Sequence, residues 1–84
     1  MRNKQRKILA RIFADPVRSD VRWSDIEALL KALGAEIIEG KGSRVSFVLR
    51  GKVAVFHRPH PQPDTDKGTL RTLRKFLVKV GIEP

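Results

Sequence analysis

The chain has 84 residues and a formal net charge of +9, because 18 lysines and arginines outnumber 9 acidic residues. This length allows one small domain, here residues 1–84, with a modest core, so a large substrate pocket is not expected. The basic balance favours a polyanionic partner, either the phosphate backbone of a nucleic acid or an acidic protein. The sequence contains no cysteine, which excludes disulfides and thiolate metal sites. With two histidines and scattered acids, we expect no metal site and no cofactor.

No stretch of the chain approaches the roughly 20 apolar residues that a membrane span needs. The basic segment from Arg2 to Arg11 lacks the apolar centre of a signal peptide. We therefore expect a soluble cytoplasmic protein that makes no membrane contact.

The first predicted element is a short helix over residues 4–14. Its apolar residues recur at helical spacing, and Pro16 ends it because the residue before a proline is biased out of the helical region. A second helix is predicted over residues 24–33. Ser24 and Glu27 have the spacing of a capping box, and Gly34 suits the left-handed position after the last turn. The apolar stripe of this second helix comprises Ile26, Leu29, Leu30 and Leu33.

Three antiparallel strands are predicted within residues 35–57. Alternating apolar and polar residues indicate half-buried strands, with turns at Gly40–Ser43 and at Gly51. If Arg50 and Gly51 form a two-residue hairpin turn, Arg44 lies opposite His57. A slip of one residue would reverse the faces, so the register is a hypothesis. It places Val45, Phe47, Ala54 and Phe56 on the core face, and Arg44, Ser46, Val55 and His57 on the other face.

A last helix is predicted over residues 67–80, with Gly81 after its end. Its predicted buried stripe comprises Leu70, Leu73, Leu77 and Val80, with Phe76 beside them. The remaining surface is basic and carries no acid; it comprises Lys67, Arg71, Arg74, Lys75 and Lys79. The element order predicts an α+β fold with the α-β-β-β-α core of double-stranded RNA-binding domains. Its three-stranded antiparallel sheet has helices on one face, and an additional N-terminal helix precedes the core.

The histidines suggest a chemistry. His57 and His60 stand in the segment His57-Arg58-Pro59-His60-Pro61, directly after the third strand. Cutting RNA without a metal requires a base for the 2′-hydroxyl proton and an acid for the leaving oxygen, and the imidazole pKa of about 6.5 suits both roles. Arg44 cannot act as a base, but its planar guanidinium holds phosphate well. We assign proton transfer to His57 or His60 and phosphate binding to Arg44. The alternatives are a turn role for the histidines and a solvated charge at Arg44.

From Trp23 to its end, the chain resembles the HicA family of bacterial type II toxins. The matching motifs, in chain order, are Leu30-Lys31-Ala32-Leu33-Gly34, Gly42-Ser43 before a strand, Pro59-His60 after the third strand, Gly68-Thr69-Leu70, and Val80-Gly81-Ile82. The resemblance implies a metal-independent endoribonuclease that cleaves mRNA and is inhibited by a HicB-like antitoxin. His60 matches a family position. Arg44 stands where the family normally has a catalytic histidine, so a non-catalytic RNA-binding module of the same fold and a basic protein-interaction domain stay open.

The basic face of the last helix is the clearest binding signal, because the equivalent helix of double-stranded RNA-binding domains contacts phosphates near its start. A solvated helix face is the alternative. Trp23 is expected to pack in the core, although stacking on a base is possible. The predicted RNA-binding residues are Lys41, Ser43, Arg58, Lys67, Arg71, Arg74 and Lys75.

Overall fold

A computed structural model describes residues 2–59 and 64–84 of the chain. The elements in chain order are α1 (Asn3–Ile12), α2 (Trp23–Ala32), β1 (Glu36–Glu39), β2 (Arg44–Leu49), β3 (Lys52–His57) and α3 (Lys67–Lys79). The strands form one antiparallel sheet in the order β1-β2-β3. The fold is therefore the predicted α+β fold, in which α2, the sheet and α3 form the α-β-β-β-α core and α1 precedes it.

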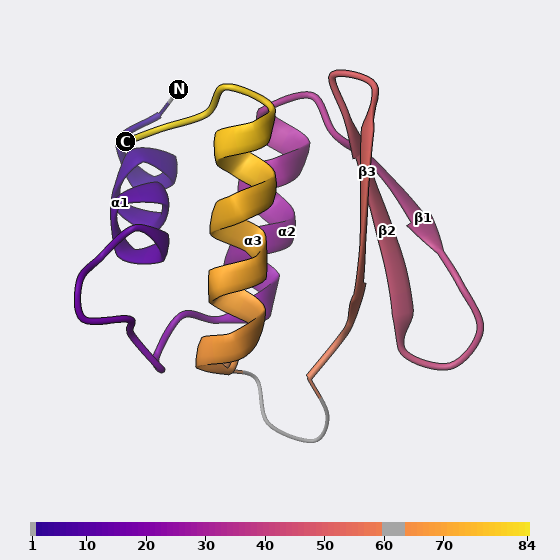
Figure 1. The fold of residues 1–84 in the computed structure, drawn as a ribbon, viewed down its shortest axis with the longest axis horizontal. Helices are drawn as coiled ribbons and strands as arrows, with labels where there is room; N and C mark the ends of the chain where they lie inside the picture. Colours follow the sequence, from indigo (N-terminus) through magenta and orange to yellow (C-terminus); the bar gives the residue numbers. More distant parts are fainter. Residues whose placement is uncertain (1, 60–63) are drawn as a thin grey trace.

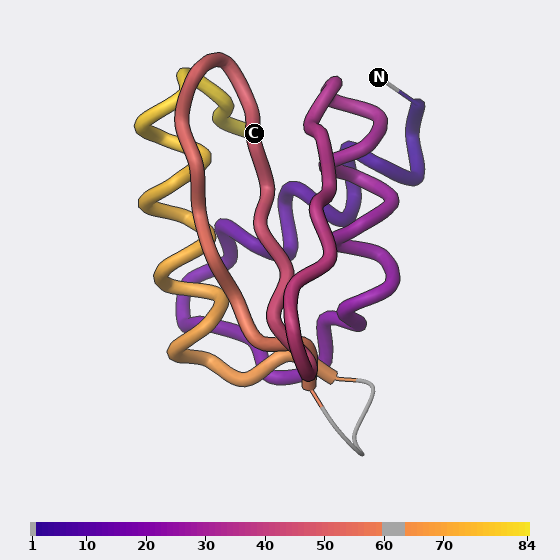
Figure 2. Tube along the Cα trace, turned by 90° about the vertical axis from the view of Figure 1, so that its right-hand side faces the viewer, coloured from indigo at the N-terminus to yellow at the C-terminus, as the bar shows by residue number. Residues whose placement is uncertain are grey.

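The elements form three layers (Figure 1). Helices α2 and α3 cover one face of the sheet, and α1 packs against these two helices on the side away from the strands. The other face of the sheet carries no helix and is turned toward the viewer in Figure 2. Within the described residues, no helix has both the length and the apolar character needed to cross a membrane.

The hairpin between β2 and β3 has the predicted register. Arg44 pairs with His57 and Val45 with Phe56, and the strands are joined by Arg50 and Gly51 alone. Both turn residues have positive φ, 51° for Arg50 and 78° for Gly51, which is the type I′ geometry that matches the twist of a hairpin. Because side chains alternate along a strand, this register decides which of them face the helices.

The two faces of the sheet differ as the register predicts. Val45, Phe47 and Phe56 are buried against α2 and α3, and Ala54 packs beside them. On the open face, Val55 and Val53 remain 53% and 61% exposed. Three aromatic rings anchor the sheet to the start of α2. The Trp23 ring stacks on Phe47 with centroids 5.8 Å apart and lies 5.9 Å from Phe56, so Trp23 is a core residue, as expected.

Two helices end in the same backbone motif. After α2, Gly34 has φ of 97° and donates its amide to the Lys31 carbonyl, while the Ala35 amide reaches the Leu30 carbonyl at 2.9 Å. After α3, Gly81 repeats this geometry with φ of 81°. These paired bonds satisfy carbonyls that the helix leaves without partners. Both predicted glycine ends are thus confirmed.

The predicted capping box at the start of α2 is wrong. The helix begins at Trp23 with Arg22 as its N-cap residue, so Ser24 lies inside the first turn and remains exposed. The Glu27 carboxylate instead accepts hydrogen bonds from the Trp23 indole and from the guanidinium of Arg58. A guanidinium is a charged donor and forms a stronger bond with a carboxylate than a free backbone amide does. Contacts with a residue far along the chain therefore decide the position of Glu27.

Candidate functional site

Arg44 and His57 are direct cross-strand partners on the open face of the sheet, at the end of the β2–β3 hairpin opposite its turn. Both residues are exposed. The next pair along is hydrogen-bonded, because the Arg58 amide donates to the Ser43 carbonyl at 2.8 Å. Hydrogen-bonded and non-hydrogen-bonded pairs alternate in antiparallel sheets, so Arg44 and His57 form a non-hydrogen-bonded pair. Such pairs have Cα atoms about 4.5 Å apart and the closest side chains.

A cavity of about 550 Å³ adjoins His57, between the end of β3 and the start of α3. His57 and Pro59 line it from the sheet side, and Gly68, Thr69 and Thr72 line it from α3. The start of α3, the end of β3 and the turn between β1 and β2 lie at the same end of the molecule (Figures 1 and 2). Neither threonine was predicted as a site residue, although Thr69 belongs to the matching motif Gly68-Thr69-Leu70 and Thr72 follows three residues later on the same helix.

Asp66 is the N-cap residue of α3. Its carboxylate accepts hydrogen bonds from the Thr69 hydroxyl at 2.6 Å and from the Thr69 amide at 3.1 Å. These bonds, the hydroxyl first, hold the pKa of the Asp66 carboxyl below its usual range. Because a carboxylate already occupies the helix N-terminus, this terminus alone is a poor phosphate site. An anion at this end of the molecule would therefore need side-chain donors from outside this helix terminus, and the exposed Arg44 is the candidate.

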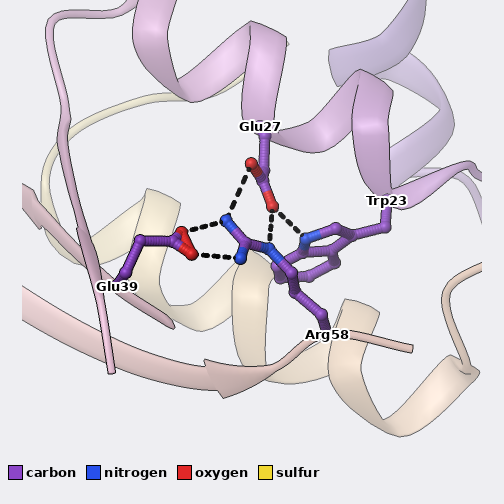
Figure 3. Close-up of polar contacts among 4 residues, drawn as sticks. All are labelled: Trp23, Glu27, Glu39 and Arg58. Carbon is purple, nitrogen blue, oxygen red and sulfur yellow. Dashed lines mark hydrogen bonds and ion pairs between the residues drawn. The ribbon is translucent and has the colours of Figure 1, made fainter. Parts of the chain in front are cut away.

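Arg58 connects three separate parts of the fold (Figure 3). Its guanidinium donates to Glu27 of α2, with Nε 2.7 Å from Oε2, and to Glu39 of β1, with Nη2 2.5 Å from Oε2. Hydrogen bonds to Glu39 and Glu27 raise the pKa of Arg58 above its ordinary value, and the bond from Arg58 lowers the pKa of Glu39. The side chain of Arg58 is 31% exposed and that of Glu27 is 23% exposed, so this network is partly shielded from water.

The comparisons with known proteins settle the family. A family model described as the HicA toxin of bacterial toxin–antitoxin systems matches residues 23–82. The chain belongs to the HicA toxin family. No curated protein and no solved structure matched the chain. The matched HicA region begins at the first residue of α2, so α1 lies outside it, as the sequence resemblance indicated.

In this HicA chain, two residues predicted to contact RNA have structural partners instead. Arg58 lines the cavity beside His57, but its guanidinium donates to the two carboxylates, which leaves few of its donors for RNA. Arg74 is half-buried and donates to the carbonyls of Ile12, at 2.5 Å from Nε, and of Ala14. These hydrogen bonds satisfy carbonyls at the C-terminal end of α1, where helical partners are missing. The proposed RNA contacts below therefore exclude Arg58 and Arg74.

The other candidate residues of this HicA chain differ in their positions. Lys41 and Ser43 are exposed in the turn between β1 and β2, beside the end of β3. Lys67, Arg71 and Lys75 are exposed on α3. His60 lies outside the described residues, so the structure brings together Arg44 and His57 but does not test the second histidine. Among residues 2–59 and 64–84, no cluster of three or more histidine, cysteine, aspartate or glutamate side chains has the arrangement to hold a metal ion.

Proposed function

We propose that the protein is a toxin that binds mRNA and cleaves it without a metal ion, and that a HicB-like antitoxin inhibits it. Membership of the HicA family supports the toxin class. The observation that carries the proposed chemistry is the pairing of Arg44 with His57 on an open sheet face, beside a cavity of about 550 Å³. This arrangement offers a phosphate-binding cation next to an imidazole, the side chain used most often in general acid–base catalysis.

The proposed reaction is an internal phosphoryl transfer. A neutral imidazole takes the proton of the ribose 2′-hydroxyl, and the 2′-oxygen then attacks the adjacent phosphorus. The bond from phosphorus to the 5′-oxygen breaks, and an acid protonates that leaving oxygen. The products are a 2′,3′-cyclic phosphate and a free 5′-hydroxyl. We assign one of the two proton transfers to His57 and the other to His60, which matches a family position.

Arg44 supplies charge and not a proton in this proposal. Its guanidinium presents parallel N–H donors to two phosphate oxygens and stabilises the additional negative charge of the transition state. Within the described residues, the Arg44 side chain makes no hydrogen bond or ion pair, which leaves its donors to a substrate. With an arginine at the family's usual histidine position, the proton transfers fall to His57, the last residue of β3, and to His60.

RNA cleavage in EDTA tests the assignment. We expect His57→Ala and His60→Ala each to lower the cleavage rate by roughly 100-fold or more, while RNA binding persists. Arg6→Ala is the matched control for charge loss, because Arg6 is exposed on α1, away from the sheet. Unaltered cleavage by His57→Ala and His60→Ala would contradict the proposal. Thermal unfolding of the variants checks that they keep the fold, which is expected for His57→Ala because His57 is exposed.

Three substitutions at Arg44 test whether this residue contributes its positive charge and not a proton transfer to cleavage. Arg44→Ala should slow cleavage by roughly 10- to 100-fold, and Arg44→Lys should retain part of the activity because it keeps the positive charge. Arg44→His restores the usual family residue. A large increase in its cleavage rate would identify the natural chain as a weakened enzyme.

One observation favours a second candidate function, a non-catalytic RNA-binding module. Arg44 replaces the residue regarded as catalytic in the family, and its side chain still suits phosphate. This alternative predicts RNA binding that weakens steeply with salt, with no cleavage at any concentration of protein. Absence of RNA affinity at low salt would instead favour a basic domain that binds an acidic protein.

A further inference from the structure

The outer edge of β3 carries backbone groups that the sheet does not use. In the β2–β3 hairpin, Arg58 and Ser43 form a hydrogen-bonded pair, and the register places Val53, Val55 and His57 in non-hydrogen-bonded pairs. The amides and carbonyls of these three residues therefore point away from β2. Strand β3 ends the sheet, and no fourth strand pairs with it within the described part of the chain. This edge can accept another strand.

A groove follows this edge between β3 and α3. The cavity beside His57 shares Val55 and Thr72 with a second cavity of about 290 Å³, which extends toward the hairpin turn. Ala54 and Phe76 give the second cavity an apolar lining. Three lysines surround it: Lys52, Lys75 and Lys79. The groove is thus polar near His57, apolar in the middle and basic near the hairpin turn.

We propose that this groove binds an extended segment of a partner protein as a fourth strand beside β3. The segment would carry both apolar and acidic side chains, because the groove combines an apolar lining with three lysines. The exposed faces of Val53 and Val55, at 61% and 53%, would extend the apolar contact. A strand in this position would also cover His57. The inference that the partner is the antitoxin rests on the proposed function.

A protein strand fits this edge better than RNA does. Backbone N–H and C=O groups alternate along the outer side of Val53, Val55 and His57, and a second peptide backbone offers a matching row of acceptors and donors. An RNA strand supplies phosphate acceptors but no such alternating row. Single-stranded RNA also gains much of its affinity from stacking on exposed aromatic rings. Phe76 and Phe56, the aromatic residues that line the groove, are buried.

The test uses the full chain and a synthetic peptide of about eight residues that alternates valine and glutamate, a length that spans β3. Amide hydrogen exchange, followed by NMR, reports on single residues. We expect the peptide to slow exchange at Val53, Val55 and His57 by tenfold or more, with little change at Ala54 and Phe56, which already bond to β2. A peptide methylated on alternate backbone nitrogens keeps its charge and apolar side chains but cannot pair. Equal binding of the methylated peptide would overturn the proposal.

Charge reversal on the protein tests whether the bound segment is acidic. Replacing Lys75 and Lys79 by glutamate should weaken peptide binding by about tenfold, because two charge pairs near the surface are lost. The control, Lys4→Glu with Lys7→Glu on α1, changes the net charge equally and should leave the affinity within twofold. An equal loss in both double variants, or the same amide protection by an uncleavable 2′-O-methyl RNA, would overturn the inference. This peptide test needs no RNA cleavage. If the peptide pairs with β3 but the protein does not cleave RNA, only the proposed nuclease activity is overturned. If the protein cleaves RNA but the peptide does not pair, only the proposed docking site is overturned.

Discussion

Two groups of basic residues in this protein have different surroundings. Arg50, Arg58 and Arg74, the structural arginines, each donate hydrogen bonds to an element far along the chain. The outer cations make no side-chain hydrogen bond or ion pair within the described residues and face solvent; they are Lys41, Arg44, Lys67, Arg71 and Lys75. A guanidinium suits fixed acceptors because its donors form a rigid planar fork. Net charge alone therefore overstates the charge available to a polyanion.

The structural arginines hold together the layers on which the site depends. Arg50 bonds the Val80 carbonyl at 2.6 Å, which connects the hairpin turn to the end of α3. Arg58 connects the end of β3 to α2 and β1, and Arg74 attaches α1 to α3. The outer cations, in contrast, are free to meet phosphates. Substitutions in the first group should change stability, whereas substitutions in the second group should change binding.

The largest effect on stability is expected at Arg58. Arg58→Ala should lower the free energy of unfolding by about 2 kcal/mol, because charge-assisted hydrogen bonds are lost and the partly buried Glu27 is left without this partner. Arg44→Ala, the matched control on the open face, should change it by less than about 0.5 kcal/mol. Urea unfolding measures the free energy of unfolding of both variants. Equal destabilisation by the two variants would contradict the division into structural and outer residues.

Arg74→Ala should have a smaller effect, about 1 to 1.5 kcal/mol, because two hydrogen bonds to the end of α1 are lost. Since these bonds attach α1, hydrogen exchange should accelerate most at the amides of that helix. Arg71→Ala, one turn away on the exposed side of α3, is the control and should leave both measurements nearly unchanged. Uniform acceleration over the whole chain would show that Arg74 supports the core instead of one helix.

Local patterns were sufficient to predict much of the fold. The register of Arg44 with His57 follows from the alternation along two strands and from a two-residue turn containing Gly51, all within one short segment. The buried stripe of α3 follows from helical spacing, and Leu70, Leu73 and Leu77 are fully buried. Such features depend on neighbours in sequence, which is why the sequence alone predicted them.

The errors came from partners distant in sequence. Glu27 has the spacing of a capping residue, but its carboxylate bonds Arg58, 31 positions later. Arg74 has the spacing of a solvent-facing base, but its acceptors, at the end of α1 and two residues beyond it, lie 62 and 60 positions earlier. No local pattern identifies these contacts, because they exist only after the layers have packed. For the same reason, the sequence could place Arg44 beside His57 but could not show that carboxylates on α2 and β1 bind Arg58.

Asp66 allows a test by pH. Hydrogen bonds from Thr69 lower its pKa in the folded protein, so its contribution to stability is present above the ordinary aspartate pKa of about 3.9 and is lost as pH falls through the folded pKa. Asp66→Asn keeps an N-cap acceptor but cannot titrate, so its stability should fall less steeply in acid than that of the wild type. Asp66→Ala should cost about 1 kcal/mol at neutral pH. Glu83→Gln near the C-terminus is the control.

The smallest expected effects concern the outer cations and RNA. Arg71→Ala and Lys75→Ala should each weaken binding to an uncleavable 2′-O-methyl RNA by a few fold, and each should reduce the slope of log affinity against log salt by about 0.7. Lys31→Ala is the control, because Lys31 lies in the last turn of α2, at the opposite end from His57. Fluorescence anisotropy over a salt series measures both quantities. If Lys31→Ala alters the slope as much as Arg71→Ala does, the overall positive charge of the protein attracts the RNA, and the RNA makes no preferred contact with the basic face of α3. In that case the outer cations near the site would have no special part in binding, and the position of the histidines relative to the RNA would rest on Arg44 alone.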